Sequence, residues 1–128
     1  MEKTIWIKAI GAALGGMLSA LFGQPDALLY ALLFAICADY ITGLFAAAYE
    51  KKLSSRTGFR GIMKKIVILI LVALSYRIGK IVELSALRDM VCGFYIANES
   101  LSVLENAARM DIPCTGKLKD VLEQLKKE

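Results

Sequence analysis

The chain has 128 residues, enough for one domain, and 57% of them are hydrophobic, which gives a mean hydropathy of +0.56. It contains 16 Lys and Arg, 12 Asp and Glu, no histidine, and three cysteines without a CxxC pair. Without histidine the chain lacks the commonest general base and metal ligand, and the odd cysteine count indicates neither a disulfide framework nor a zinc site. The composition therefore argues against an enzyme, and we expect no metal and no cofactor.

The charges are unevenly distributed along the sequence. They concentrate at residues 49–65, 77–89 and 105–128 and leave long apolar stretches nearly bare. This segregation favours an all-α integral membrane protein, with the lipid bilayer as its partner, over a soluble helical bundle. The net charge of +4 would also suit a nucleic-acid binder. However, the basic residues lie between apolar runs and no nucleic-acid-binding motif is present, so we expect no nucleic-acid partner.

The first predicted membrane helix covers about residues 5–22 and is expected to remain uncleaved. Small residues recur in it every four positions, at Gly11, Gly15 and Ser19. Such a ridge lets two helix backbones approach closely, so it predicts a helix-packing surface. The alternative is that these residues reflect only how common glycine and alanine are in membrane helices.

The second predicted helix, about residues 27–48, spans roughly 33 Å, which is enough to cross the hydrocarbon core of a bilayer. Its small residues also recur every four positions, and the stripe of Ala31, Ala35 and Gly43 contains Asp39. The aspartate is therefore expected to face a neighbouring helix or a lumen, whereas the bulky apolar side chains on the other faces are expected to face lipid.

A basic loop is predicted at residues 49–61, between the second and third helices. Residues 49–65 hold six basic side chains against the single acid Glu50. Such an excess of Lys and Arg in a short connection predicts the cytoplasmic side of the membrane, where it would favour anionic lipid headgroups. The six residues are Lys51, Lys52, Arg56, Arg60, Lys64 and Lys65.

The third predicted helix, about residues 62–81, has a continuously apolar centre and carries Arg77 near its far end. After the fourth helix, residues 116–127 have the apolar spacing of a short amphipathic helix. This tail could dock on the bilayer, on a sister subunit or on the helical bundle, and its sequence does not choose among them.

The fourth predicted helix, about residues 90–107, contains Asn98, Glu99 and Glu105. Central acids are costly in lipid, so this helix needs protein or water along one face. The alternative is an amphipathic helix that lies on the membrane surface.

The loop charges predict a multi-pass protein with four spans and with both termini in the cytoplasm. The basic loop lies inside, Lys3 and Lys8 place the start of the chain inside, and residues 23–26 carry no Lys or Arg, as expected for an outside loop. The rival is a three-span arrangement that leaves the first or the fourth segment on the surface.

In the four-span arrangement, Asp39, Asn98 and Glu99 fall at one depth, near the middle of the membrane. Arg77 is the nearest basic residue, roughly two helical turns or less away. The acids are protonated and hydrogen-bonded between helices, or they pair with Arg77, or they face water inside an oligomer. Acids inside a membrane are functional candidates by default, and a purely structural role between helices is the alternative.

No phosphate-binding loop, catalytic Ser/His/Asp set, nucleotide motif or metal cluster occurs in the sequence. The sequence therefore indicates a small membrane protein that has polar residues on some helix faces and stripes of small residues for close helix packing. Such a chain acts by assembling, and we expect its output to be a pore or lesion, with a small channel subunit as an alternative.

Three stretches of the sequence resemble the bacteriophage holin family, which also occurs in toxin-secretion loci of Gram-positive bacteria. They are DYITG at 39–43, KKLSSRTGFRGIMKKI at 51–66 and FYIANESLSVLENAARMDIP at 94–113, followed by LKDVLEQLKK. Together they cover most of residues 37–127, and the second and third stretches are the more specific ones.

The resemblance implies a phage lysis protein of the host cytoplasmic membrane. Holins form homo-oligomers and at a set time open lesions, through which an endolysin reaches the cell wall or a large toxin leaves the cell, without necessary direct contact with the holin. Antiholins resemble holins and delay them, so the resemblance implies either a holin or an antiholin-like regulator, and an antiholin is also an expected partner.

Overall fold

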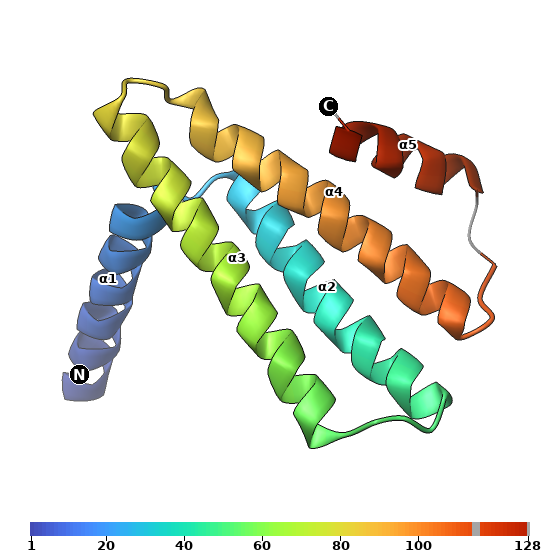
Figure 1. The fold of residues 1–128 in the computed structure, drawn as a ribbon. Helices are drawn as coiled ribbons and strands as arrows, with labels where there is room; N and C mark the ends of the chain where they lie inside the picture. Colours follow the sequence, from blue (N-terminus) through green and yellow to red (C-terminus); the bar gives the residue numbers. More distant parts are fainter. Residues whose placement is uncertain (114–115, 128) are drawn as a thin grey trace.

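The computed structural model describes residues 1–113 and 116–127, and these form five α-helices and no strand. The all-helical class expected from the sequence is therefore confirmed. The helices are α1 (Glu2–Phe22), α2 (Ala27–Tyr49), α3 (Ser55–Ile81), α4 (Ala86–Arg109) and α5 (Gly116–Lys127) (Figure 1).

Helices α2, α3 and α4 form the body of the protein, and α4 packs against both of the others (Figure 1). The buried centre contains Leu32, Ile36, Val72 and Cys92. Leu32 and Ile36 thus point into the protein, which corrects the expectation that the bulky side chains of α2 face lipid. They are buried because α2 packs α4 with its leucine face as well as with its small-residue stripe.

The residues that face the bundle recur at alternating intervals of three and four along each helix. This spacing is typical of helices that pack at a shallow angle, as in coiled coils. It turns polar side chains at these positions toward the interior. On α3 these positions are Gly58, Gly61, Lys65, Ile68, Val72, Ser75 and Gly79. On α4 they include Arg88, Cys92, Tyr95, Glu99, Ser102 and Asn106, and Ala97 and Leu101 are buried beside them.

Helix α3 begins at Ser55 rather than near residue 62, and α4 begins at Ala86 rather than near residue 90. The earlier start of α3 has a local cause, because the Ser54 hydroxyl accepts a hydrogen bond from the Thr57 amide at 3.2 Å and caps the helix. Lys and Arg are also good helix formers. Most of the residues expected in a basic loop are therefore helical, and residues 50–54 form the connection.

Helices α2, α3 and α4 all end in the same way. The residues Lys51, Glu83 and Asp111 take positive φ angles of 59°, 57° and 60°. In each case the amide of the following residue donates a hydrogen bond to a carbonyl of the last helical turn. This is the Schellman motif, in which glycine usually occupies the position with positive φ. These endings reverse the chain quickly, so the connections between the helices are short.

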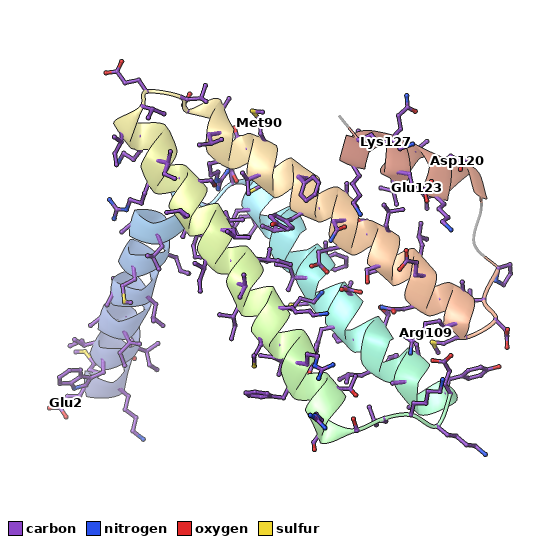
Figure 2. All side chains as sticks on the ribbon, viewed as in Figure 1. Glu2, Met90, Arg109, Asp120, Glu123 and Lys127 are labelled. Atoms are coloured by element: carbon purple, nitrogen blue, oxygen red, sulfur yellow. The ribbon has the colours of Figure 1, made fainter. Side chains whose placement is uncertain are left out.

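Helix α1 diverges from the bundle and contacts α3 only near its own C-terminal end (Figure 1). None of its residues is buried, and most of its side chains project into open space (Figure 2), although Phe22 packs against the buried centre of the bundle. It ends at Gly23, whose φ of 84° favours glycine and where a Cβ atom would lie 2.7 Å from the Tyr76 ring.

Among the described residues, α1 and α2 are the two helices that are long and apolar enough to cross a membrane, whereas four were expected. Helix α3 has Lys64, Lys65, Arg77 and Lys80 on both sides of its apolar centre, and α4 contains amides and acids. Helix α5 lies alongside α4, so the tail docks on the bundle, which the sequence had left open (Figure 1).

Candidate functional site

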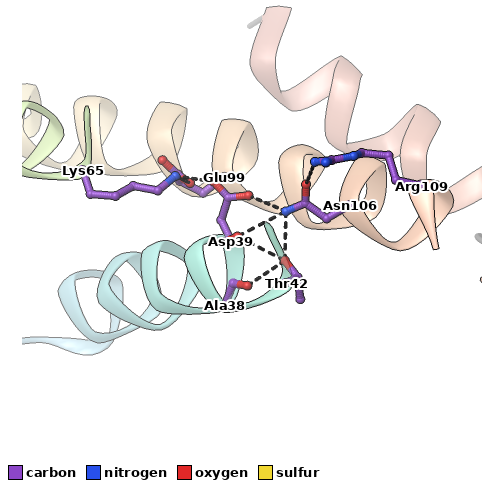
Figure 3. A network of polar contacts seen from close by, with 7 residues as sticks. All are labelled: Ala38, Asp39, Thr42, Lys65, Glu99, Asn106 and Arg109. Carbon is purple, nitrogen blue, oxygen red and sulfur yellow. Dashed lines mark hydrogen bonds and ion pairs between the residues drawn. The ribbon is translucent and has the colours of Figure 1, made fainter. Parts of the chain in front are cut away.

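A charged network joins the three helices of the bundle (Figure 3). The Lys65 ammonium on α3 donates hydrogen bonds to Asp39 Oδ2 on α2 and to Glu99 Oε2 on α4, the latter at 2.5 Å. The side chains are 17%, 9% and 2% exposed, in that order. One ammonium group is therefore shared by two buried carboxylates, and each of the three groups comes from a different helix.

Asn106 extends the network toward one end of the bundle (Figure 3). Its Nδ2 donates to Asp39 Oδ1 and to Thr42 Oγ1, both at 2.9 Å, and its Oδ1 accepts from Arg109 Nη1 at 3.3 Å. Arg109 in turn donates to Glu50 Oε1 at 2.6 and 2.9 Å. Polar contacts thus run without interruption from the interior to the basic connection. Within the described part of the chain, every buried side-chain nitrogen or oxygen has a hydrogen-bond partner.

The energetics of this network are asymmetric. Burying charges is expensive, and their mutual attraction offsets that cost only when every member is paired. Here one cation faces two carboxylates, so the ionised trio of Lys65, Asp39 and Glu99 carries a formal charge of −1. Losing the cation would leave two like charges together, whereas losing one carboxylate would leave a matched pair.

The structure distributes the other candidate polar residues differently. Asn98 lines a cleft beside the network, and Glu105 is exposed and lines a hollow between α4 and α5. Arg77 is exposed on α3 and lies beside the end of α1. The basic partner of the acids is thus Lys65 and not Arg77, which faces away from them.

Sequence reasoning placed Lys65 at the edge of a cytoplasmic connection, because a lysine ordinarily ends an apolar run. The signal that could have found it is the spacing along α3. Lys65 is four residues from Gly61 and three from Ile68, on the same face as the buried Val72. The missed Asn106 follows the same spacing, because it lies seven residues, or two turns, after Glu99.

The predicted packing ridges are only partly used within the chain. On α2, Ala35 is buried and Gly43 lies beside the Asn106 amide, whereas Ala31 is exposed. On α1, Ser19 is half-buried, while a Cβ atom added at Gly11 or Gly15 would meet nothing within 4 Å. The α1 ridge therefore presents an unoccupied face.

Arg88 forms a second polar cluster, at the opposite end of the bundle, that the sequence did not indicate. Its buried guanidinium donates to the Phe22 carbonyl at 3.1 Å, to Asp26 Oδ2 at 2.8 Å and to Asp89 Oδ1 at 3.0 Å. The hydrogen bond from Arg88 lowers the pKa of Asp26 below its ordinary value. Asp26 also accepts from the Leu29 amide and caps α2, so Arg88 fastens the α1–α2 turn to the start of α4.

Within residues 1–113 and 116–127, no group of three or more Cys, Asp and Glu side chains is placed to hold a metal ion.

The sequence model of the bacteriophage holin family matches residues 16–127. The chain belongs to the bacteriophage holin family. The resemblance seen in the three sequence stretches is thereby confirmed. Holin-family proteins are non-enzymatic membrane proteins, and membership together with the apolar α1 and α2 indicates membrane association.

One named relative supports the same assignment, and other similar proteins are uncharacterized. A probable holin of Bacillus phage phi105 is 31% identical over 109 residues, which cover 84% of this holin-family chain and 80% of the relative. An uncharacterized protein of Listeria innocua is 44% identical over 95% of this chain and 86% of its own length. An uncharacterized 14.9 kDa protein of Clostridium perfringens is 37% identical over 98% and 97%. No solved structure matches the chain.

Proposed function

We propose that this chain is a phage holin, which accumulates in the bacterial cytoplasmic membrane, self-associates and opens timed lesions that release an endolysin or a large toxin. The observation that carries the proposal is the buried network of Lys65, Asp39 and Glu99 inside an apolar helical bundle of a holin-family chain. A protein with no further need of these charges would be at least as stable with apolar residues in their place.

In the proposed resting state, the polar groups of the network satisfy one another inside each monomer. Lesion formation separates α3 from α2 and α4, so that the carboxylates and the ammonium face water in a lumen shared between copies. Water compensates for the lost pairing because it hydrates each charge. The network thus keeps the monomer closed while making an aqueous alternative accessible to the same side chains.

We further propose that α1 mediates association between copies. Its apolar side chains are exposed from Ile5 to Leu21, and the glycine face at Gly11 and Gly15 has room for a second helix backbone. The arrangement has four membrane-embedded helices with both termini in the cytoplasm. This topology is supported by the positions of the turns. The 50–54 connection and the end of α4 lie at one end of the bundle, and the 23–26 and 82–85 turns lie at the opposite end (Figure 1).

An inducible-expression experiment tests the function. Culture density and membrane potential are followed in cells that express the chain with or without a cytoplasmic endolysin. We expect abrupt loss of membrane potential at a reproducible time, and lysis only when endolysin is present.

The other outcomes separate the alternative functions. Harmless expression that delays lysis by a second holin would identify an antiholin-like regulator. Continued growth with a steady small conductance would identify a channel subunit. Either result would refute the holin proposal. Alkylation of single cysteines introduced in the 23–26 and 82–85 turns tests the topology independently, because four spans place both turns outside.

A further inference from the structure

A cleft of about 480 Å³ lies between α2, α3 and α4, at the end of the bundle nearest the 50–54 connection. Its inner part is formed by the buried charged network, and its outer part carries exposed basic side chains. The charged residues that line it are Asp39, Lys65 and Glu99 inside and Arg60, Lys64 and Arg109 outside.

Two of these cations have no acid to neutralise them. The two carboxylates inside the cleft both pair with Lys65, which leaves one formal negative charge there, and Arg109 is held by Glu50. Arg60 and Lys64 are exposed, and no ion pair joins either of them to an acid of the described residues. They lie four residues apart on α3, so both side chains project from one face of the helix toward the same opening.

The wall between these cations and the bundle is apolar. Leu44 and Leu53 line it together with Ile68, and the Tyr40 ring packs against Gly58 and Gly61 on the α3 side. An anion that carries a hydrocarbon portion could therefore bind the two cations with its charged group and the adjacent apolar surface with its hydrocarbon.

We propose that this cleft binds the headgroup of an anionic phospholipid. The phosphate lies between Arg60 and Lys64, because Arg forms paired hydrogen bonds with phosphate oxygens and Lys supplies a second charge. The glycerol and the first part of an acyl chain lie along Leu44 and Ile68. A free phosphate ion would use the same cations but would gain nothing from the apolar wall, which is why we assign the site to a lipid. The proposal requires membrane residence but not lesion formation, so it can fail while the holin function stands.

The test uses the full-length protein in a neutral detergent, where no membrane surface attracts lipid nonspecifically. Phosphatidylglycerol, phosphatidylcholine or inorganic phosphate is added, and retained molecules are counted by native mass spectrometry. The test variant is Arg60→Gln/Lys64→Gln. The matched control is Lys52→Gln/Arg56→Gln, which removes the same charge from exposed positions outside the cleft. Glutamine keeps the helix propensity, and circular dichroism checks that both variants remain folded.

We expect the wild-type protein and the control to retain phosphatidylglycerol in preference to phosphatidylcholine, and the test variant to bind it about tenfold or more weakly. Equal losses in the two variants would overturn the site, because the attraction would then be general. Equal binding of phosphatidylcholine would also overturn it. Inorganic phosphate that competes fully with the lipid at equal concentration would overturn the assignment to a lipid.

Discussion

The ammonium of Lys65 lies 2.5 Å from the carboxylate of Glu99, although the two residues are 34 positions apart and belong to different helices. The same ammonium also contacts Asp39, so a single side chain connects α3 to both of its neighbours. Because the carboxylates outnumber the cation, the three residues are expected to respond very differently to substitution.

Replacing Lys65 by Met removes the shared cation and leaves two buried carboxylates without compensation. We expect the free energy of unfolding in detergent micelles to fall by about 3–5 kcal/mol. The neighbouring Lys64→Met is the control, because that side chain is exposed, and it should stay within about 0.5 kcal/mol of wild type. Denaturant titration followed by circular dichroism measures both. Equal effects of the two substitutions would show that the network does not stabilise the bundle.

Removing one carboxylate should cost much less than removing the cation. Asp39→Asn or Glu99→Gln leaves a one-to-one pair with Lys65, so each is expected to lower the free energy of unfolding by about 1–2 kcal/mol. The Asp39→Asn/Glu99→Gln double variant leaves the lysine unpaired and should cost clearly more than the sum of the two. A double-mutant cycle measures this difference, and simple additivity would contradict the shared-cation geometry.

Neutralising Asp39 should also change the time of lysis in the expression assay. Asp39→Asn keeps an acceptor for the Asn106 amide but removes the charge, whereas Asp39→Leu removes both. We expect both variants to alter the onset of lysis, and the leucine variant to alter it more. Wild-type timing with both substitutions would assign Asp39 a structural role alone.

The turn between α3 and α4 should be sensitive to a single methyl group. A Cβ atom at Gly79 would lie 2.7 Å from the Leu84 carbonyl oxygen, and backbone there cannot move aside without disturbing the turn. We expect Gly79→Ala to destabilise the protein by about 1–3 kcal/mol. Gly93→Ala is the matched control in α4, where the methyl group meets nothing within 4 Å, and it should stabilise by about 0.5–1 kcal/mol. Thermal unfolding of the two variants distinguishes these opposite signs.

The Arg88 cluster predicts a specific dependence of stability on acid. The folded-state pKa of Asp26 is lowered from 3.8, chiefly by the hydrogen bond from Arg88. The ionised Asp26 therefore contributes stability that is fully present above about pH 4 and is lost as the pH falls through the lowered pKa. Asp26→Asn retains an acceptor for the Leu29 amide but cannot titrate.

Unfolding measured between about pH 2 and pH 6 should show the wild type losing stability relative to Asp26→Asn as the pH falls. In an Arg88→Gln background this pH-dependent difference should shrink, because the charged partner is gone. A difference between wild type and Asp26→Asn that is constant with pH would contradict the role of Arg88.

The sequence predicts α2 almost to the residue, because its start carries both an Asp cap and an apolar run. The ends of α2, α3 and α4 are harder to foresee, since Lys51, Glu83 and Asp111 occupy positions where glycine is the usual signal. Helix α3 starts earlier than predicted because the basic residues Arg56 and Arg60 resemble part of a loop, although nothing in their intrinsic preference opposes a helix.

The candidate site was only partly accessible to sequence reasoning. Asp39 and Glu99 attracted attention because acids are rare in apolar segments. Their partner Lys65 did not, because a lysine ordinarily ends an apolar run, and only its spacing relative to Ile68 and Val72 indicates that it faces inward. Asn106 and Arg88 were missed for the same reason, since their roles depend on contacts with residues more than 60 positions away.

The regular spacing of Glu99 and Asn106 also restricts how α4 can change its length. One residue inserted between them would rotate everything after it by about 100° around the helix axis, and the Asn106 amide would leave Asp39. A seven-residue insertion would bring the amide back to nearly the same side but about 10 Å farther along. Natural variation in length among such chains should therefore accumulate in the connections, while the distance along α4 between these two side chains stays fixed.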